Sequence, residues 1–133
     1  MVLLERLRMA SIGPGCGRVA ALYSASGVHE FPFTMSGGRT RIEGHAAIAE
    51  FLASVYRSLP LQYTEYRRIA VHQATDTTMM VEQEALGVNT RTGARFVLPN
   101  VAVIDVDADG LIASFRDYAN PVALAEALGD DVR

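Results

Sequence analysis

The chain has 133 residues, of which half are apolar and a fifth are charged, and its formal net charge is -3. A chain of this length fits one domain and buries roughly two thirds of the surface that it exposes when unfolded. Its arginines are scattered along the sequence, which argues against the basic surface that is typical of nucleic-acid-binding proteins. We therefore expect a single domain over residues 1–133 that binds no nucleic acid.

The only cysteine, Cys16, lies in a segment of glycines and a proline over residues 13–17. It cannot form an internal disulfide, and no Cys-x-x-Cys pair accompanies it. Charged residues from Glu5 onward interrupt the apolar start of the chain before a signal peptide or a membrane span could develop. The sequence therefore predicts a soluble, unprocessed cytoplasmic protein with no membrane contact.

The first third of the chain predicts two helices and a strand. Leucines at helical spacing predict a helix over 2–10, which the segment 13–17 ends. A second short helix is predicted over 18–25. Residues 28–33 alternate around two aromatic side chains and predict a strand, and its proline confines that strand to an edge or a bulge.

The rest of the chain predicts a helix, four long strands and a last helix. Apolar residues at three- and four-residue steps predict the helix over 46–58, which Pro60 ends. Turn-forming residues separate the next elements, so these are expected to pair as antiparallel hairpins. A proline that is tolerated at a helix start opens the last helix, over 121–128. The strands are predicted over 62–73, 78–88, 95–106 and 111–118. Helices first and strands later indicate an α+β fold.

Four stretches of the sequence together resemble one known superfamily. They are Glu-Phe-Pro-Phe at 30–33, Ile-Glu-Gly-His-Ala-Ala-Ile at 42–48, Val-Glu-Gln-Glu at 81–84 and Phe-Arg-Asp-Tyr-Ala-Asn-Pro at 115–121. In this order they resemble the nuclear transport factor 2-like (SnoaL-like) superfamily. The last stretch is similar to the branch that includes phenazine biosynthesis protein A/B.

The resemblance implies a cystatin-like, nuclear transport factor 2-like fold, in which helices wrap a curved antiparallel sheet into a cone-shaped pocket. It also implies a homodimer formed through the outer face of the sheet. The superfamily includes ketosteroid isomerases, limonene epoxide hydrolases, polyketide cyclases and members without chemistry, so it implies a pocket and no particular reaction. The arginine-x-aspartate pair of the epoxide hydrolases is not evident around residues 82–84, which argues against that activity.

Asp117 is the first candidate catalytic residue. The resemblance places it near the end of the last strand, where several enzymatic relatives carry an acidic residue that shuttles a proton. An aspartate in an apolar cavity also loses the hydration of its charged form, so its pKa rises toward neutrality. The alternative is that Asp117 caps the last helix or pairs with one of three arginines, Arg67, Arg68 or Arg116.

Glu84 is a second candidate catalytic residue, and Glu82 shares its face because side chains alternate along a strand. If that face lines the pocket, the second carboxylate could form an acid/base pair with Asp117. If that face meets solvent or a partner subunit, both glutamates are ordinary polar residues of a sheet surface.

Two further polar residues are candidates for orienting a substrate. Asn100 interrupts an apolar strand, and its amide needs a hydrogen-bond partner if it is buried. It could hold a substrate carbonyl or pair with neighbouring backbone. Tyr56, on the helix over 46–58, could act as a general acid or an orienting donor, or it could simply pack in the core.

A set of apolar side chains could line the pocket: Phe31, Phe33, Met35, Leu52, Met80 and Phe96. His29 shares a face with two of these phenylalanines and could lie at the pocket rim, but the pattern favours a structural role for it and for His72. No histidine, cysteine or carboxylate residues stand at metal-ligand spacing, and no nucleotide, serine-hydrolase or zinc motif is present. We expect neither a metal nor a cofactor.

Two functional hypotheses follow from the sequence. The first is a cofactor-independent isomerase or cyclase that transfers a proton in a small, mostly apolar, carbonyl-bearing metabolite. The second is a non-catalytic module of the same fold that binds a ligand or only dimerises. A raised pKa at Asp117 distinguishes the first from the second.

Overall fold

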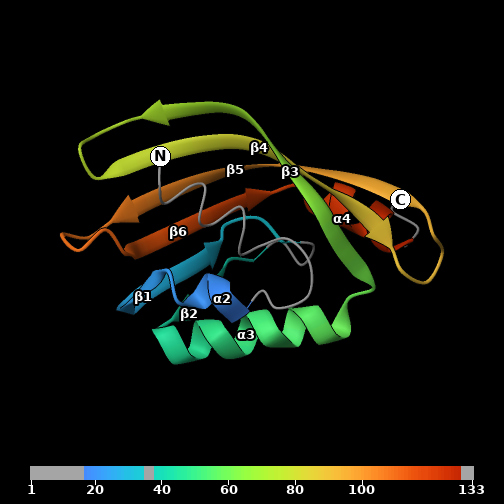
Figure 1. Cartoon of the computed structure of the whole chain (residues 1–133), viewed down its shortest axis with the longest axis horizontal. Coiled ribbons are helices and arrows are strands. Elements are labelled where there is room, and N and C mark those ends of the chain that lie inside the picture. The colour runs from blue at the N-terminus through green and yellow to red at the C-terminus, as the bar shows by residue number, and fades with distance from the viewer. Residues whose placement is uncertain (1–16, 35–37, 130–133) are drawn as a thin grey trace.

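The structure is a computed structural model that describes residues 17–34 and 38–129. One curved sheet of six strands lies against a long helix, and shorter helices lie near its ends (Figure 1). In chain order the elements are α2 (Gly17–Ala20), β1 (Tyr23–Phe31), β2 (Thr40–Glu43), α3 (His45–Ser58), β3 (Leu61–Gln73), β4 (Thr78–Asn89), β5 (Arg95–Val106), β6 (Ile112–Ala119) and α4 (Pro121–Leu128).

The strand order in the sheet is β2-β1-β6-β5-β4-β3. Strands β3 to β6 form consecutive antiparallel hairpins, which confirms the predicted meander. Strand β2 pairs antiparallel with β1, whereas β1 pairs parallel with β6. The predicted α+β class with a curved, mainly antiparallel sheet is confirmed, and β1 with β6 is its one parallel pair.

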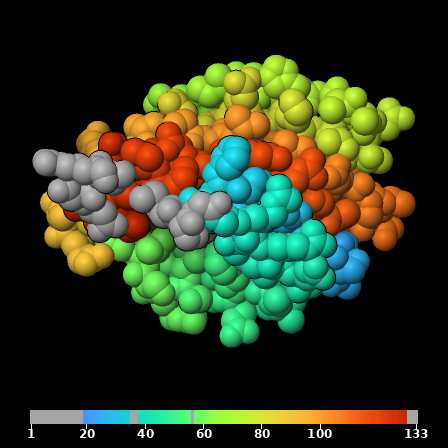
Figure 2. All heavy atoms as spheres, turned by 180° about the vertical axis from the view of Figure 1, so that it is seen from behind, coloured from blue at the N-terminus to red at the C-terminus, as the bar shows by residue number. Residues whose placement is uncertain are grey.

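The hydrophobic core lies between the sheet and helices α2 and α3. Its largest fully buried side chains are Ile48 on α3, Ile104 on β5, Ile112 on β6 and Val81 on β4. Viewed from behind (Figure 2), α3 lies along one side of the molecule and the β3–β4 hairpin lies along the opposite side. Strands β5 and β6 run between them. The sheet therefore curves over α3 and leaves a concave face toward it.

Gly87 allows two strands to approach closely on the concave face. A Cβ atom at this position would lie 2.1 Å from the backbone oxygen of Gln62 on β3 and 2.6 Å from Cζ of Phe96 on β5. Any larger residue would push β3 and the Phe96 ring away from β4. Glycine is therefore needed at this point of the pairing between β3 and β4.

The start of the chain differs from the sequence-based expectation. The predicted helix over 18–25 is only the four-residue α2, and the chain is already extended from Tyr23. The amide of Ile112 bonds to the carbonyl oxygen of Leu22, and Tyr23 pairs with Ile112 in the sheet. Tertiary pairing with β6 thus outweighs the local helical pattern. The predicted helix over 2–10 lies outside the described residues.

Pro32 does not place its strand at an edge of the sheet. Strand β1 ends at Phe31, directly before the proline, and has neighbours on both sides. Its pairing with β6 is irregular between Tyr23 and Val28. The proline acts as a strand end, because it has no N–H to continue the ladder.

The last helix begins at Pro121, as predicted. The side chain of Asn120 accepts hydrogen bonds from the amides of Val122 (3.0 Å) and Ala123 (3.2 Å), so asparagine is the cap of α4. None of the described helices is both long and apolar enough to cross a membrane.

Candidate functional site

A cavity of about 460 Å³ opens between α3 and the concave face of the sheet. This volume lies in the range of small-molecule sites, about 300–1,000 Å³. Most of the wall is apolar, and representative side chains are Phe31, Phe51, Leu52, Val55, Leu98 and Phe115. Such a wall excludes water from any polar group that it surrounds, so the few polar lining residues decide the chemistry of the cavity.

Asp117 lies on β6 and faces this cavity. Nδ2 of Asn100, on the neighbouring strand β5, donates a hydrogen bond of 2.8 Å to its Oδ1. The helix cap at this end of the sheet is Asn120, and Arg116 pairs with Asp105 (3.2 Å) on the other face. Asp117 therefore neither caps α4 nor forms an ion pair with Arg116.

Burial raises the pKa of Asp117 from its ordinary 3.8 to about 6, and the hydrogen bond from Asn100 opposes this rise because it stabilises the charged form. The residue is only partly buried by surface area, since its carboxylate opens on the cavity. A carboxyl group with this pKa is partly protonated and partly ionised near neutral pH. It can therefore both accept and return a proton.

Tyr23 and His29, both on β1, line the cavity. The Tyr23 hydroxyl and Nδ1 of His29 are hydrogen-bonded at 2.6 Å, and the imidazole stacks on Phe115 with ring centroids 4.9 Å apart. Burial lowers the pKa of His29 to about 4. Burial also raises the pKa of the Tyr23 hydroxyl, and the nearby carboxylate of Asp117 adds to this rise. Both side chains are therefore neutral at pH 7.

For His29 the sequence left open a place at the pocket rim or a structural role, and the structure shows a buried side chain that also lines the cavity. It is 6 % exposed, and its Nε2 has no hydrogen-bond partner in the part of the chain that the structure describes. A protonated imidazole would have to be accommodated in this apolar surrounding, which is the physical reason that its pKa falls.

The register of β4 places Gln83, and not its two glutamate neighbours, in the cavity. Gln83 lines the cavity together with Val81 and Ala85. Glu82 and Glu84 point to the outer face, where His72 lies 2.8 Å from Glu82 and Arg67 lies 3.5 Å from Glu84. The expectation that Glu84 could join Asp117 in the cavity is corrected, because side chains alternate and the opposite face is the concave one.

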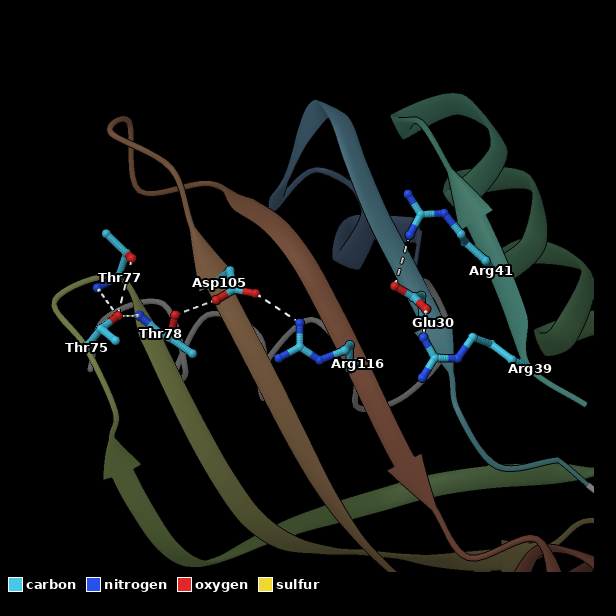
Figure 3. Close-up of polar contacts among 8 residues, drawn as sticks. All are labelled: Glu30, Arg39, Arg41, Thr75, Thr77, Thr78, Asp105 and Arg116. Carbon is cyan, nitrogen blue, oxygen red and sulfur yellow. Dashed lines mark hydrogen bonds and ion pairs between the residues drawn. The ribbon is translucent and has the colours of Figure 1, made fainter.

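Other charged groups pair with one another, as Figure 3 shows, and none of them lines the cavity. Asp105 accepts hydrogen bonds from Arg116 and from the Thr78 hydroxyl, which lie on the two neighbouring strands. Glu30 on β1, 8 % exposed in its side chain, pairs with Arg39 (2.9 Å) and Arg41 (3.1 Å). These contacts tie strands together on the outer face and leave the concave face mostly apolar.

The structure sorts the expected apolar lining residues into three groups. Phe31, Phe33 and Leu52 line the cavity, as does Asn100. Phe96 is buried and packs edge-on against Tyr63, 5.7 Å between ring centroids, while Met80 points to the outer face. Neither residue lines the cavity. The register of β4 turns Met80 outward, whereas Phe96 is on the concave face and its ring packs beside Gly87 and Tyr63. Met35 and the side chain of Tyr56 lie outside the described part of the structure.

Among the polar lining residues that sequence reasoning missed are Tyr23, Arg68 and Gln83. Gln83 alternates with Glu82 and Glu84, so the correct choice of face would have found it. Tyr23 was hidden in a predicted helix. Arg68 belongs to an Arg-Arg pair on β3, and alternation sends only one member of such a pair toward the cavity.

Within residues 17–34 and 38–129, no group of three or more histidine, cysteine or carboxylate side chains is arranged to hold a metal ion. The expectation that the protein works without a metal or a cofactor stays a prediction.

Comparisons with known proteins agree with this fold. A family model described as a SnoaL-like domain matches residues 16–115. The chain is 31% identical to the uncharacterised protein YesE of Bacillus subtilis over 109 residues, which are 81% of this chain and 72% of that protein. It is 29% identical over 129 residues to an uncharacterised phenazine biosynthesis A/B-like protein of Pseudomonas aeruginosa, covering 96% and 88% of the two chains.

Solved structures show the same fold. A phenazine biosynthesis-related protein from Pseudomonas aeruginosa has a TM-score of 0.80 at 21% identity and covers 99% of this chain and 86% of its own. A Δ5-3-ketosteroid isomerase from a Mycobacterium species has a TM-score of 0.69 at 20% identity, with 92% and 93% covered. At these identities the similarity establishes the architecture, and the chemistry must be argued from the site itself.

Proposed function

Because the chain belongs to the SnoaL-like domain family, we propose that its cavity binds a small, mostly apolar metabolite with a carbonyl group and moves a proton in it. Asp117 carries the proton, and no cofactor takes part. The observation that supports this most is the pKa of about 6 at a carboxyl group that faces an otherwise apolar cavity. An isomerase or a cyclase uses a step of this kind.

The proposed step begins with the ionised carboxylate of Asp117. It accepts a proton from the carbon next to the substrate carbonyl, and the electron pair of that C–H bond moves into an enolate. The resulting neutral carboxylic acid then returns the proton to the same or another carbon. An amide has two N–H donors, so Asn100 can bind Asp117 with one and the enolate oxygen with the other.

The step can be tested by hydrogen exchange at a simple ketone. We expect the protein to accelerate exchange of the methyl protons of acetophenone in D₂O, as measured by proton NMR. The substitution Asp117→Asn should reduce this acceleration by at least about a hundredfold, because a positioned acid/base group typically contributes 10²–10⁴-fold.

Glu84→Gln is the matched control, because it removes a carboxylate from the outer face of β4. It should leave the exchange rate nearly unchanged. If the wild-type protein binds ketones and does not accelerate exchange, the proposal of catalysis fails, and the alternative of a non-catalytic binding module replaces it.

We further propose that the protein forms a homodimer through the outer face of the sheet. Met80 and Val103 are paired across β4 and β5, and Val101 pairs with Glu82 on the same face. Met80 is 37 % exposed and Val97, on the same face of β5, is 48 % exposed. The pairs Arg67–Glu84 and His72–Glu82 flank these apolar side chains, so the surface presents both positive and negative groups at its edge. Such a surface can pack against a second copy of itself across a two-fold axis.

A further inference from the structure

The concave face carries one row of polar side chains that runs across four strands. Asp117 on β6 is hydrogen-bonded to Asn100 on β5, Asn100 pairs in register with Gln83 on β4, and Gln83 pairs with Arg68 on β3. Residues directly opposite each other in an antiparallel pair share a face. All four line the cavity, so the row crosses its floor from an acid at one end to a guanidinium at the other.

Among the described lining residues, Asp117 is the only carboxylate and Arg68 the only permanently charged cation. The strands of the row are about 4.8 Å apart, so the backbones of β3 and β6 are separated by roughly 14 Å. Both terminal side chains line the cavity, and Asp117 is half-buried whereas Arg68 is exposed at its end of the row. The space between them suits a ligand of one or two rings with different polar groups at its two ends.

On the basis of the function proposed above, we propose that the natural ligand is an anionic oxo compound, with its carboxylate at Arg68 and its carbonyl at Asn100 and Asp117. A ligand carboxylate in an apolar cavity costs free energy unless a donor pairs with it. The planar guanidinium offers two parallel N–H donors to such a group.

The orientation follows from the charges at the two ends of the row. A ligand carboxylate next to Asp117 would meet a like charge whenever Asp117 is ionised, whereas at Arg68 it meets an opposite one. Arg68 has other interactions as well. A guanidinium has five N–H donors, so it can keep a protein partner and still bind a ligand.

The neighbouring Arg67 provides a matched control on the same strand. It faces the outer side, where it lies 3.5 Å from Glu84. The variants Arg68→Gln and Arg67→Gln therefore remove the same charge from the two opposite faces of β3. A change in ligand affinity that is due to net charge alone appears in both variants. A change that is due to a contact in the cavity appears only in Arg68→Gln.

The test uses 4-acetylbenzoate, which has a ketone and a carboxylate at opposite ends, and its neutral methyl ester. Dissociation constants are measured at pH 7.5 from amide chemical shifts in NMR titrations. We expect the wild-type protein and Arg67→Gln to bind the acid at least about tenfold more tightly than the ester, the size expected of one charge-assisted contact. Arg68→Gln should bind both equally.

Equal affinity for the acid and the ester in the wild-type protein overturns the inference. A preference for the acid that persists in Arg68→Gln also overturns it, as does a failure of the wild-type protein to bind either probe. The outcome is separable from that of the proposed function. If 4-acetylbenzoate binds with the expected preference but its methyl protons do not exchange, catalysis at Asp117 fails and the anion site stands. If exchange occurs without a preference for the acid, the anion site fails alone.

Discussion

Asn100 donates a hydrogen bond of 2.8 Å from Nδ2 to Oδ1 of Asp117, across the pairing of β5 with β6. The bond acts against the effect of the cavity on the same carboxyl group. Burial favours the neutral acid, and the amide donor favours the carboxylate. Their balance leaves the pKa of Asp117 at about 6, close enough to neutrality for a proton to move in both directions.

Removing the amide should shift this balance. In Asn100→Ala the pKa of Asp117 rises above its wild-type value of about 6, because only the effect of burial remains. The pKa is measured by NMR of the carboxyl carbon, with Asp117→Asn to assign the signal. The pH at which ketone exchange becomes fast should rise by the same amount, since the ionised form is the base.

Gln83→Ala is the control for this experiment, because it removes an amide one strand further from the carboxylate. It should change the pKa of Asp117 much less than Asn100→Ala does. A pKa that stays constant or falls in Asn100→Ala would show that the hydrogen bond does not stabilise the ionised form.

Asp117 and His29 should change the free energy of unfolding in opposite directions as the pH rises. The pKa of His29 is about 4 in the folded protein and 6.5 in a free side chain, so the unfolded chain binds more protons between these values. Its contribution to the free energy of unfolding therefore rises with pH from about 4 to 6.5. For Asp117 the folded protein binds more protons between pH 3.8 and about 6, so its contribution falls as the pH rises.

Each contribution amounts to about 3 kcal/mol across its window, at 1.36 kcal/mol per pKa unit, and the two largely cancel in the wild-type protein. Urea denaturation at pH 4.5 and pH 6.5 measures the difference. Relative to the wild-type protein, Asp117→Asn should gain stability on going to pH 6.5, and His29→Gln should lose it. The same change with pH in all three proteins would contradict both assignments.

The sequence was sufficient to predict the elements whose pattern is local. The observed bounds of α3, of the meander β3 to β6 and of α4 lie within one or two residues of the predicted ranges. Turn residues and apolar periodicity specify these elements before any tertiary contact forms. Strand β1 was placed too late in the chain, because its first residues are held by β6, about ninety positions further along.

The choice of face was beyond the sequence. The alternation of side chains along a strand showed that Glu82 and Glu84 share one face of β4. Which face lines the cavity depends on the curvature of the sheet over α3, and this curvature places Gln83 on the concave face. The same applies to Met80, which is apolar and nevertheless lies outside. Asp117 was identified from a local motif, whereas its partner in the row, Arg68, depends on the register of three strand pairs.

A charge placed on the outer face should prevent dimer formation. We expect the wild-type protein to have twice the monomer mass of 14.4 kDa, measured by light scattering after gel filtration. Met80→Lys should shift it to the monomer, because a lysine in the centre of an apolar contact leaves its charge unpaired. Val122→Lys, on an exposed position of α4, serves as the control and should remain dimeric. A monomeric wild-type protein at all concentrations would reject the interface.

Filling the cavity from the helix side should weaken ligand binding without unfolding the protein. Val55 lines the cavity from α3, so the indole of Val55→Trp would occupy space that a ligand needs. We expect the affinity for 4-acetylbenzoate to fall at least about tenfold, since each 1.4 kcal/mol of lost contact is a factor of ten. Glu50→Trp places the same side chain on the exposed side of α3 and should bind normally. If Val55→Trp keeps its thermal midpoint and also its affinity, the ligand binds elsewhere. A loss of binding confined to Val55→Trp would place the ligand between α3 and the polar row of the sheet.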